Sequence, residues 1–234
     1  MNKLFTIAKK ELGTYFKSPM AYLVLIITIS VFNFFFFIII DHNQEASLRD
    51  MFRIMEFMFV FITPILTMKT FSEEKRAGTM EFLLTSPVTP AQIVLGKYLG
   101  TLLFFSILIG LTFSYYILLE IFSQIDKAAA LVGYMGVWLE GALFIAIGIL
   151  MSSLTRNQLI AAISSYAILL MLYFSSALAK FFDPRFREFL NNISFFTRNE
   201  NLSSGLVTLA DGVYFVSVIL FCLTLTVIII RKQR

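Results

Sequence analysis

The sequence predicts an all-α polytopic membrane protein with six transmembrane helices, an N-terminal interfacial amphipathic helix and one cytoplasmic helix between the second and third spans. Hydrophobic residues make up 58% of the 234-residue chain and charged residues 15%, against about 25% charged residues in soluble domains. The apolar residues gather in runs of about 20, the length of helix that crosses a bilayer core. A soluble enzyme or a nucleic-acid-binding domain is therefore excluded, despite a net charge of +4.

Six uncharged or nearly uncharged runs predict the membrane spans. Their expected ranges are 20–40, 51–71, 98–119, 128–154, 157–179 and 212–230. Ser18 and Pro19 fit the N-cap and the first position of the first helix. In the second run, Arg53, Glu56 and Lys69 are expected near the helix ends, where long side chains can reach the interface.

The distribution of Lys and Arg predicts the orientation of the chain. One side of the membrane holds 12 of the 19 basic residues, namely Lys3, Lys9, Lys10, Lys17, Lys69, Lys75, Arg76, Lys97, Arg156, Arg231, Lys232 and Arg234. The other side holds the remaining seven, together with ten of the 15 acidic residues. The more basic side faces the cytoplasm, so both termini are expected there. The surplus positive charge then reflects orientation and contact with anionic lipid, and no nucleic acid is implied.

Two segments are expected to lie along the membrane surface. Residues 2–17 project as an amphipathic helix, with apolar side chains on one side, lysines on the other and Glu11 as the one charge among the apolar side chains. A short basic amphipathic helix before a first span lies flat in the interface, as an anchor that can also touch a partner. Residues 180–211, on the extracellular side, mix many aromatic residues with charges and are expected to dip into the interface.

A short helix is expected over residues 72–86, between the second and third spans. Ser72 can cap its N-terminus, and Glu73 and Glu74 in its first turn favour the helix dipole. Pro87 ends it, because the residue before a proline is pushed out of helical space. Such a helix is too short to cross the bilayer. It either rests on the membrane with a solvated face or docks onto a soluble partner.

The chain lacks the residues that common catalytic and metal sites require. No glycine-rich loop carries the Gly-Lys-Ser or Gly-Lys-Thr ending that cradles nucleotide phosphates. The single histidine, His42, and the single cysteine, Cys222, are too few for a zinc site or a disulfide framework. We therefore expect no catalytic residue, no cofactor and no metal on this chain.

One ionisable residue, Glu140, interrupts the fourth span. An ionised carboxylate near mid-membrane is costly, so Glu140 should face protein or water. Glycines that share its side of the helix allow close helix packing; they are Gly133, Gly136, Gly141 and Gly148. Two interpretations stay open for Glu140: a protonated or hydrogen-bonded packing residue, and a role in a substrate path or proton relay. Gly96 and Gly100 form a second small-residue pair, for which packing is expected.

The stretch Phe71-Ser-Glu-Glu-Lys-Arg-Ala-Gly-Thr-Met-Glu-Phe-Leu-Leu-Thr-Ser-Pro-Val88, followed by Gly96-Lys97, resembles the signature loop of type-2 ATP-binding-cassette (ABC) transporter permeases. Residues 152–158 and 206–214 extend the resemblance over nearly the whole chain. Within that superfamily, the chain is most similar to the gliding-motility-associated permeases.

The resemblance implies a single permease domain over 1–234 in the bacterial cytoplasmic (inner) membrane. Its partners would be a second permease copy or a related permease, and two cytoplasmic ATPase subunits that bind ATP and Mg²⁺; a periplasmic or membrane accessory subunit could join them. Residues 72–86 would form the coupling helix that seats in the ATPase, residues 2–17 would also touch it, and residues 152–158 would make a smaller contact. The implied ATPase-contact residues are Glu73, Glu74, Arg76, Gly78, Thr79, Glu81, Leu83, Leu84 and Arg156.

Three functions are compatible with the sequence. The first is an ABC export permease powered by a partner ATPase. The second is a proton-coupled secondary carrier that uses Glu140, and the third is a membrane scaffold that transmits ATPase motion to a periplasmic partner. Inverted repeats with matching broken helices, which are typical of many carriers, are not evident in the sequence, and this disfavours the second function.

Overall fold

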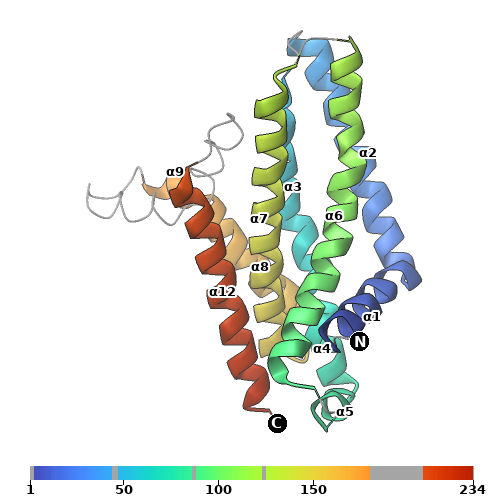
Figure 1. The fold of residues 1–234 in the computed structure, drawn as a ribbon, viewed down its shortest axis with the longest axis vertical. Coiled ribbons are helices and arrows are strands. Elements are labelled where there is room, and N and C mark those ends of the chain that lie inside the picture. The colour runs from blue at the N-terminus through green and yellow to red at the C-terminus, as the bar shows by residue number, and fades with distance from the viewer. Residues whose placement is uncertain (1–2, 44–46, 86–87, 123–124, 180–207, 234) are drawn as a thin grey trace.

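The computed structural model describes residues 3–43, 47–85, 88–122, 125–179 and 208–233, and these ranges contain helices and no strands. The helices are α1 (Lys3–Lys17), α2 (Pro19–Asn43), α3 (Arg49–Thr67), α4 (Lys69–Arg76), α5 (Met80–Thr85), α6 (Pro90–Phe122), α7 (Lys127–Leu154), α8 (Gln158–Tyr173), α9 (Ser175–Ala179) and α12 (Leu209–Arg231). The long helices stand side by side, and α1 lies across their lower end (Figure 1). The N and C marks also lie at that end.

Five helical segments are long and apolar enough to cross a membrane, by length and composition. They are α2, α3 together with α4, α6, α7 and α12. Pro19 is the first residue of α2, as its sequence position predicts. The third expected span, 98–119, lies inside a longer helix, because α6 begins at Pro90. That extension carries the polar residues that build the site described below.

The expected span 157–179 is divided in the structure. Its main part, α8, has 16 residues, or about 24 Å of helix, which is shorter than a bilayer core of about 30 Å. The helix ends at Phe174, whose ψ is 0°, and α9 continues for five residues. Ser175 and Ser176 follow the break, and the Ser175 hydroxyl donates to the carbonyl of Leu172 at 2.7 Å. Serine pairs are common sites of helix kinks. Five of the six expected spans are therefore long enough to cross a membrane, and the segment expected at 157–179 is not among them.

The central helix of the bundle is α7, which packs against α3, α4, α6, α8 and α12. All residues from 140 to 150 are buried. Its glycines permit this packing: a Cβ on Gly141 would stand 2.0 Å from Cε1 of Phe105, and one on Gly148 would stand 2.1 Å from Oγ1 of Thr67. These distances are far below ordinary contact, so α3 and α6 approach α7 only because the glycines lack side chains.

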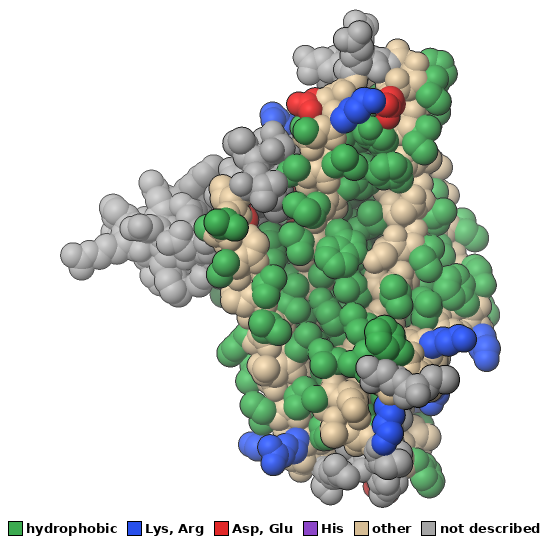
Figure 2. Space-filling view, viewed as in Figure 1, with side chains coloured by type: hydrophobic (Ala, Val, Ile, Leu, Met, Phe, Trp, Pro, Cys, Tyr) green, Lys and Arg blue, Asp and Glu red, His purple; other side chains and the backbone are tan. Residues whose placement is uncertain are grey.

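The surface of the bundle separates apolar and charged side chains along its length. In Figure 2 hydrophobic side chains cover the middle of the visible face, and Lys and Arg gather at the lower end, with further charges at the top. Helix α2 exposes large apolar side chains to its surroundings, including Ile26 at 66% and Phe37 at 72%. This distribution is expected when the middle of the bundle faces lipid.

The expected segment 180–211 lies outside the described residues, apart from its last four. Those belong to the start of α12, where Thr208 caps the helix by accepting from the backbone N–H of Asp211 at 3.3 Å.

Candidate functional site

The expected single helix over 72–86 is instead two helices, α4 and α5, joined by a turn at residues 77–79. Gly78 has a φ of +71°, a left-handed conformation that costs other residues about 1 kcal/mol or more. The Ala77 N–H closes the last turn of α4 on the carbonyl of Glu73 at 2.9 Å. Basic residues followed by glycine are a helix-stop signal, so Lys75-Arg76-Ala77-Gly78 carried the information that our prediction missed.

Helix α4 also begins earlier than expected, and nearly continues α3. Only Met68 separates them, and its φ and ψ remain helical at −55° and −32°. The second span and the first half of the expected coupling helix thus form one bent rod, with α5 as a short arm after it (Figure 1). We refer to the α4–turn–α5 unit, Lys69–Thr85, as the elbow.

The root of the elbow is fixed to the lower end of α7 by two serines. The buried Ser152 hydroxyl accepts from the backbone N–H groups of Phe71 (3.1 Å) and Ser72 (3.2 Å), and donates to the carbonyl of Met68 (3.0 Å). Next to it, the Lys75 ammonium donates to the carbonyl of Ser153. One hydroxyl therefore stabilises the bend between α3 and α4 and ties it to α7.

A second attachment is ionic and buried. Lys97, 4% exposed, extends from the N-terminal part of α6 and pairs with Glu74 of α4 at 2.8 Å and with Glu11 of α1 at 3.2 Å. It also donates to the Thr70 carbonyl at 2.8 Å and lies 5.3 Å from the centre of the Phe71 ring. We call Glu11, Glu74 and Lys97 the ionic cluster. It joins three helices that are remote in sequence.

Helix α1 reaches this cluster because two glycines let it approach α6. A Cβ on Gly96 would lie 2.7 Å from Cβ of Ile7, and one on Gly100 would lie 2.6 Å from Cβ of Glu11 and 2.8 Å from the carbonyl of Ala8. All three distances are too short for real Cβ atoms, so any side chain would push α1 away. Packing is thus the role of the small-residue pair, and its partner is α1.

Tyr15 adds a third connection between α1 and the bundle. Its hydroxyl donates to the carbonyl of Leu66 at 3.0 Å and lies 3.1 Å from the hydroxyl of Thr101, and its ring stacks on Phe104 at 4.8 Å. Helix α1 is consequently held by an aromatic stack, hydrogen bonds and an ion pair. Glu11, which seemed misplaced on the apolar side of α1, is the residue that makes the ion pair.

Burial dominates the electrostatics of Glu11. Removal from water raises the pKa of its carboxyl above the ordinary 4.5, and the Lys97 ammonium opposes the rise. Fully ionised, the cluster has two negative charges and one positive charge. Lys97 is the one cation that pairs with both carboxylates, and Lys10 adds a weaker attraction to Glu11.

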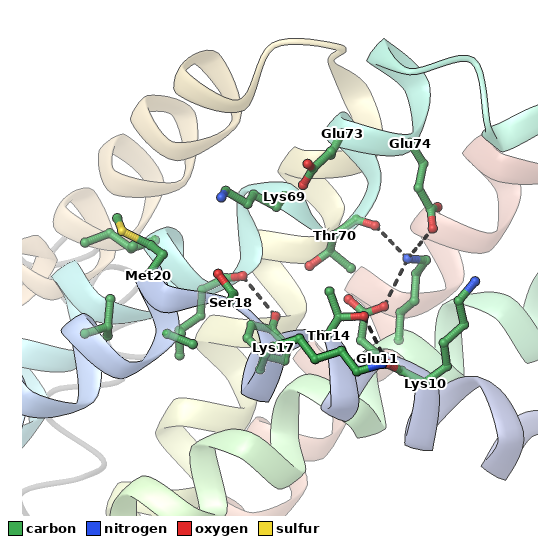
Figure 3. A pocket seen from close by; sticks show the side chains of 16 residues that line it. Lys10, Glu11, Thr14, Lys17, Ser18, Met20, Lys69, Thr70, Glu73 and Glu74 are labelled. Atoms are coloured by element: carbon green, nitrogen blue, oxygen red, sulfur yellow. Dashed lines mark hydrogen bonds and ion pairs between the residues drawn. The ribbon is translucent and has the colours of Figure 1, made fainter.

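Two pockets flank the cluster. One, of about 440 Å³, lies between α1, the start of α2, the end of α3 and α4 (Figure 3). The other, of about 550 Å³, lies beside Ile7, Thr79, Phe82 and Val88 at the elbow. The charged side chains of the cluster line both.

The structure separates the expected ATPase-contact residues into two groups. Glu73, Arg76, Gly78, Thr79, Glu81 and Arg156 are exposed at the end of the molecule where the elbow lies. Glu74 is half-buried and belongs to the ionic cluster. The backbones of Leu83 and Leu84 lie in α5, and their side chains are outside what the structure describes. Phe82, 78% exposed, was missed, although its place between charged and apolar residues of the quoted loop could have singled it out.

Glu140 lies inside the protein, 1% exposed, and a second carboxyl, Glu56, is 2% exposed. The expectation that Glu56 reaches the interface is therefore wrong: α3 turns it inward, whereas Arg53, one turn earlier, is exposed and pairs with Asp50 at 3.4 Å. Glu56 and Glu140 both act electrostatically on Tyr173, at the end of α8. Among the described residues, no group of acidic, His or Cys side chains could hold a metal ion.

The described part of the chain is an all-helical bundle with five candidate membrane spans, and the elbow is fixed to α1, α6 and α7 at one end of it. These features define a multi-pass membrane protein. A family model described as "ABC-2 family transporter protein" matches residues 5–231, so the chain belongs to this family. It is an ABC transporter permease, a transmembrane component that implies a separate ATP-binding subunit. A search of the curated proteins finds no match.

Proposed function

We propose that this chain is an export permease of the bacterial cytoplasmic membrane, driven by a separate subunit that binds ATP and Mg²⁺, with both of its termini in the cytoplasm. The observation that carries the proposal is the elbow. Its tip exposes Phe82 and charged side chains, whereas its root is tied to α1 and α6 through Lys97 and to α7 through Ser152. A large apolar side chain amid exposed charges suits a hot spot for a protein partner.

The elbow can act as a lever in this proposal. A push on α5 would reach α4, and α4 is bonded to helices that continue into the membrane. Because packed helices move as rigid bodies more readily than they deform, ATPase closure would shift α3, α6 and α7 together. A path between two permease subunits would then open or close.

Three further parts of the proposal rest on the sequence resemblance. The permease pairs with a second copy or a related permease; an accessory subunit joins the complex; and the chain belongs to the gliding-motility-associated branch. The export direction has the same support.

Co-purification tests the proposal. We expect a soluble protein with a Gly-x-x-x-x-Gly-Lys-Ser/Thr motif to accompany the native chain from its own membranes. Phe82→Ser and Glu81→Lys should each weaken that association by about tenfold, equivalent to about 1.4 kcal/mol. The matched control is Asp41→Lys, the same charge change in α2 at the opposite end of the bundle. Equal complex yield and equal ATPase rate in all variants would show that the tip of the elbow does not contact the ATPase.

The buried Glu56 and Glu140 keep the proton-coupled carrier as a second candidate. Reconstitution without any ATPase distinguishes it: transport that follows a pH gradient, and that Glu140→Gln abolishes, would favour the carrier. Unchanged transport by Glu140→Gln between pH 5 and 8 would assign Glu140 to packing. ATPase-dependent movement of α5 with no transported substrate would instead identify the scaffold.

A further inference from the structure

The pocket of about 440 Å³ beside α1 has features that neither the ATPase contact nor the ionic cluster explains. Figure 3 shows Lys69, Thr70, Ser18 and Lys17 on one side of Glu11, and Lys10 on the other side of it. Residues of five helices, α1, α2, α3, α4 and α6, line it, so it exists only in the folded bundle. It lies at the polar end of the molecule, where α1 meets the first span.

The open part of this pocket is positively charged. Four lysines and three glutamates line it: Lys10, Lys17, Lys69, Lys97, Glu11, Glu73 and Glu74. Lys97 is already paired with Glu11 and Glu74. Three exposed lysines then face a single exposed carboxylate, Glu73. Such an excess of ammonium groups favours an anion.

A buried hydroxyl also faces the pocket. Thr70 is 3% exposed, and its Oγ1 has no partner at full hydrogen-bond geometry within the described part of the chain; it interacts only with the nearby Tyr15 hydroxyl. The neighbouring Thr14 hydroxyl donates to the carbonyl of Lys10 at 3.0 Å, and the Tyr15 hydroxyl is engaged by Leu66. Thr70 is therefore a donor that a bound group could use, since a buried hydroxyl without a well-aligned partner is destabilising.

The remaining wall is apolar and leads toward the lipid-facing surface. Met20, Ala21, Val24 and Ile65 line it, and α2 continues upward with exposed apolar side chains such as Ile27, 54% exposed. A ligand that uses the whole pocket would carry an anionic head and an apolar tail. Basic pockets beside transmembrane helices on the cytoplasmic side are suited to anionic lipid headgroups.

The geometry points to a structural lipid site: the pocket binds the phosphate of an anionic phospholipid beside Lys17 and Lys69, with Lys10 adding positive charge at its edge, Thr70 as a hydroxyl donor and an acyl chain along α2. This site is distinct from the tip of the proposed ATPase contact, because no residue of α5 lines it, although it shares Lys69, Glu73 and Glu74 with the root of the elbow.

Lipid retention by the purified full chain tests the site. Native mass spectrometry in detergent would compare phosphatidylglycerol with phosphatidylcholine of the same acyl chains. We expect wild type to retain phosphatidylglycerol preferentially, and Lys10→Gln/Lys17→Gln/Lys69→Gln to weaken retention about tenfold more than a control that loses the same charge. The control is Lys9→Gln/Arg231→Gln/Lys232→Gln, whose exposed side chains lie outside the pocket.

Thr70→Val provides a second variant that keeps the shape of the side chain. Because its hydroxyl has no partner at full hydrogen-bond geometry in the described part of the chain, a purely structural role predicts unchanged or higher stability. We expect unchanged stability with weaker phosphatidylglycerol retention. Equal losses in the pocket and control triple variants, equal retention of the two lipids, or full displacement by soluble glycerol phosphate at the same concentration would each overturn the lipid site.

Discussion

Lys97→Met removes the one positive charge of the ionic cluster and keeps most of the volume of the Lys97 side chain. Its two ion pairs, at 3.2 Å to Glu11 and 2.8 Å to Glu74, correspond to about 5 and about 6 kcal/mol of Coulomb energy at an effective dielectric constant near 20. Desolvation of the three groups offsets much of that energy. The variant leaves two largely buried carboxylates without a cation, a change that costs about 3–5 kcal/mol.

For a chain of this size, that loss corresponds to a fall of about 6–20 °C in the unfolding midpoint. The single cysteine, Cys222, is buried, so its reaction with a thiol-specific dye during heating reports unfolding in detergent. The difference in unfolding midpoint between Lys97→Met and wild type should shrink as the pH falls and the carboxylates are protonated. Adding Glu11→Gln and Glu74→Gln to Lys97→Met should restore most of the stability. A midpoint within about 2 °C of wild type, or a triple variant as unstable as Lys97→Met, would refute the electrostatic reasoning.

Three further predictions concern the same end of the molecule. Burial holds the pKa of Glu11 above 4.5, so the folded chain keeps this proton at pH values where the unfolded chain has lost it. The stability that Glu11 contributes therefore rises as the pH falls through that window. Glu11→Gln should flatten this part of a curve of unfolding midpoint against pH, and an unchanged slope would contradict the assignment. Gly100→Ala should loosen α1 by about 1–3 kcal/mol, seen as faster tryptic cleavage in α1, whereas Gly110→Ala, with nothing within 4 Å of its Cβ, should not. Gly78→Ala should cost about 1 kcal/mol of stability because of the positive φ of Gly78. Gly13→Ala, in helical α1 with open space around it, should be neutral or stabilising. Equal unfolding midpoints for these two variants would argue against strain at the turn.

Most of the helical layout could be predicted because it follows from single-residue properties. Runs of apolar residues locate five spans, and the Ser18-Pro19 pair locates the start of α2. The break at Phe174 was not predictable from hydropathy, since the residues on both sides are apolar or small. There the helix ends at a local break, where the Ser175 hydroxyl bonds to the carbonyl of Leu172.

The site was predictable only in part, because its bonds join residues far apart in the chain. Glu11 and Lys97 are separated by 86 positions, and Ser152 and Ser72 by 80. Glu11 looked like an exception in an apolar arc, and nothing local indicated its partner. Glu56 was misplaced for the same reason, since its proximity to a helix end suggested exposure, and the packing of α3 against α7 and α8 was not visible in the sequence. The turn at Gly78, by contrast, had a local signal in the sequence.

The separation of Glu11 from Lys97 also sets an order of events during synthesis. At about 5–20 residues per second, the 86 positions between them take about 4–17 seconds to translate. For that interval α1 has emerged without its cation and without the two glycines against which it packs. Helices α2 and α3 are therefore synthesised before the N-terminal helix can dock, and α1 can form this ion pair only once α6 has been made.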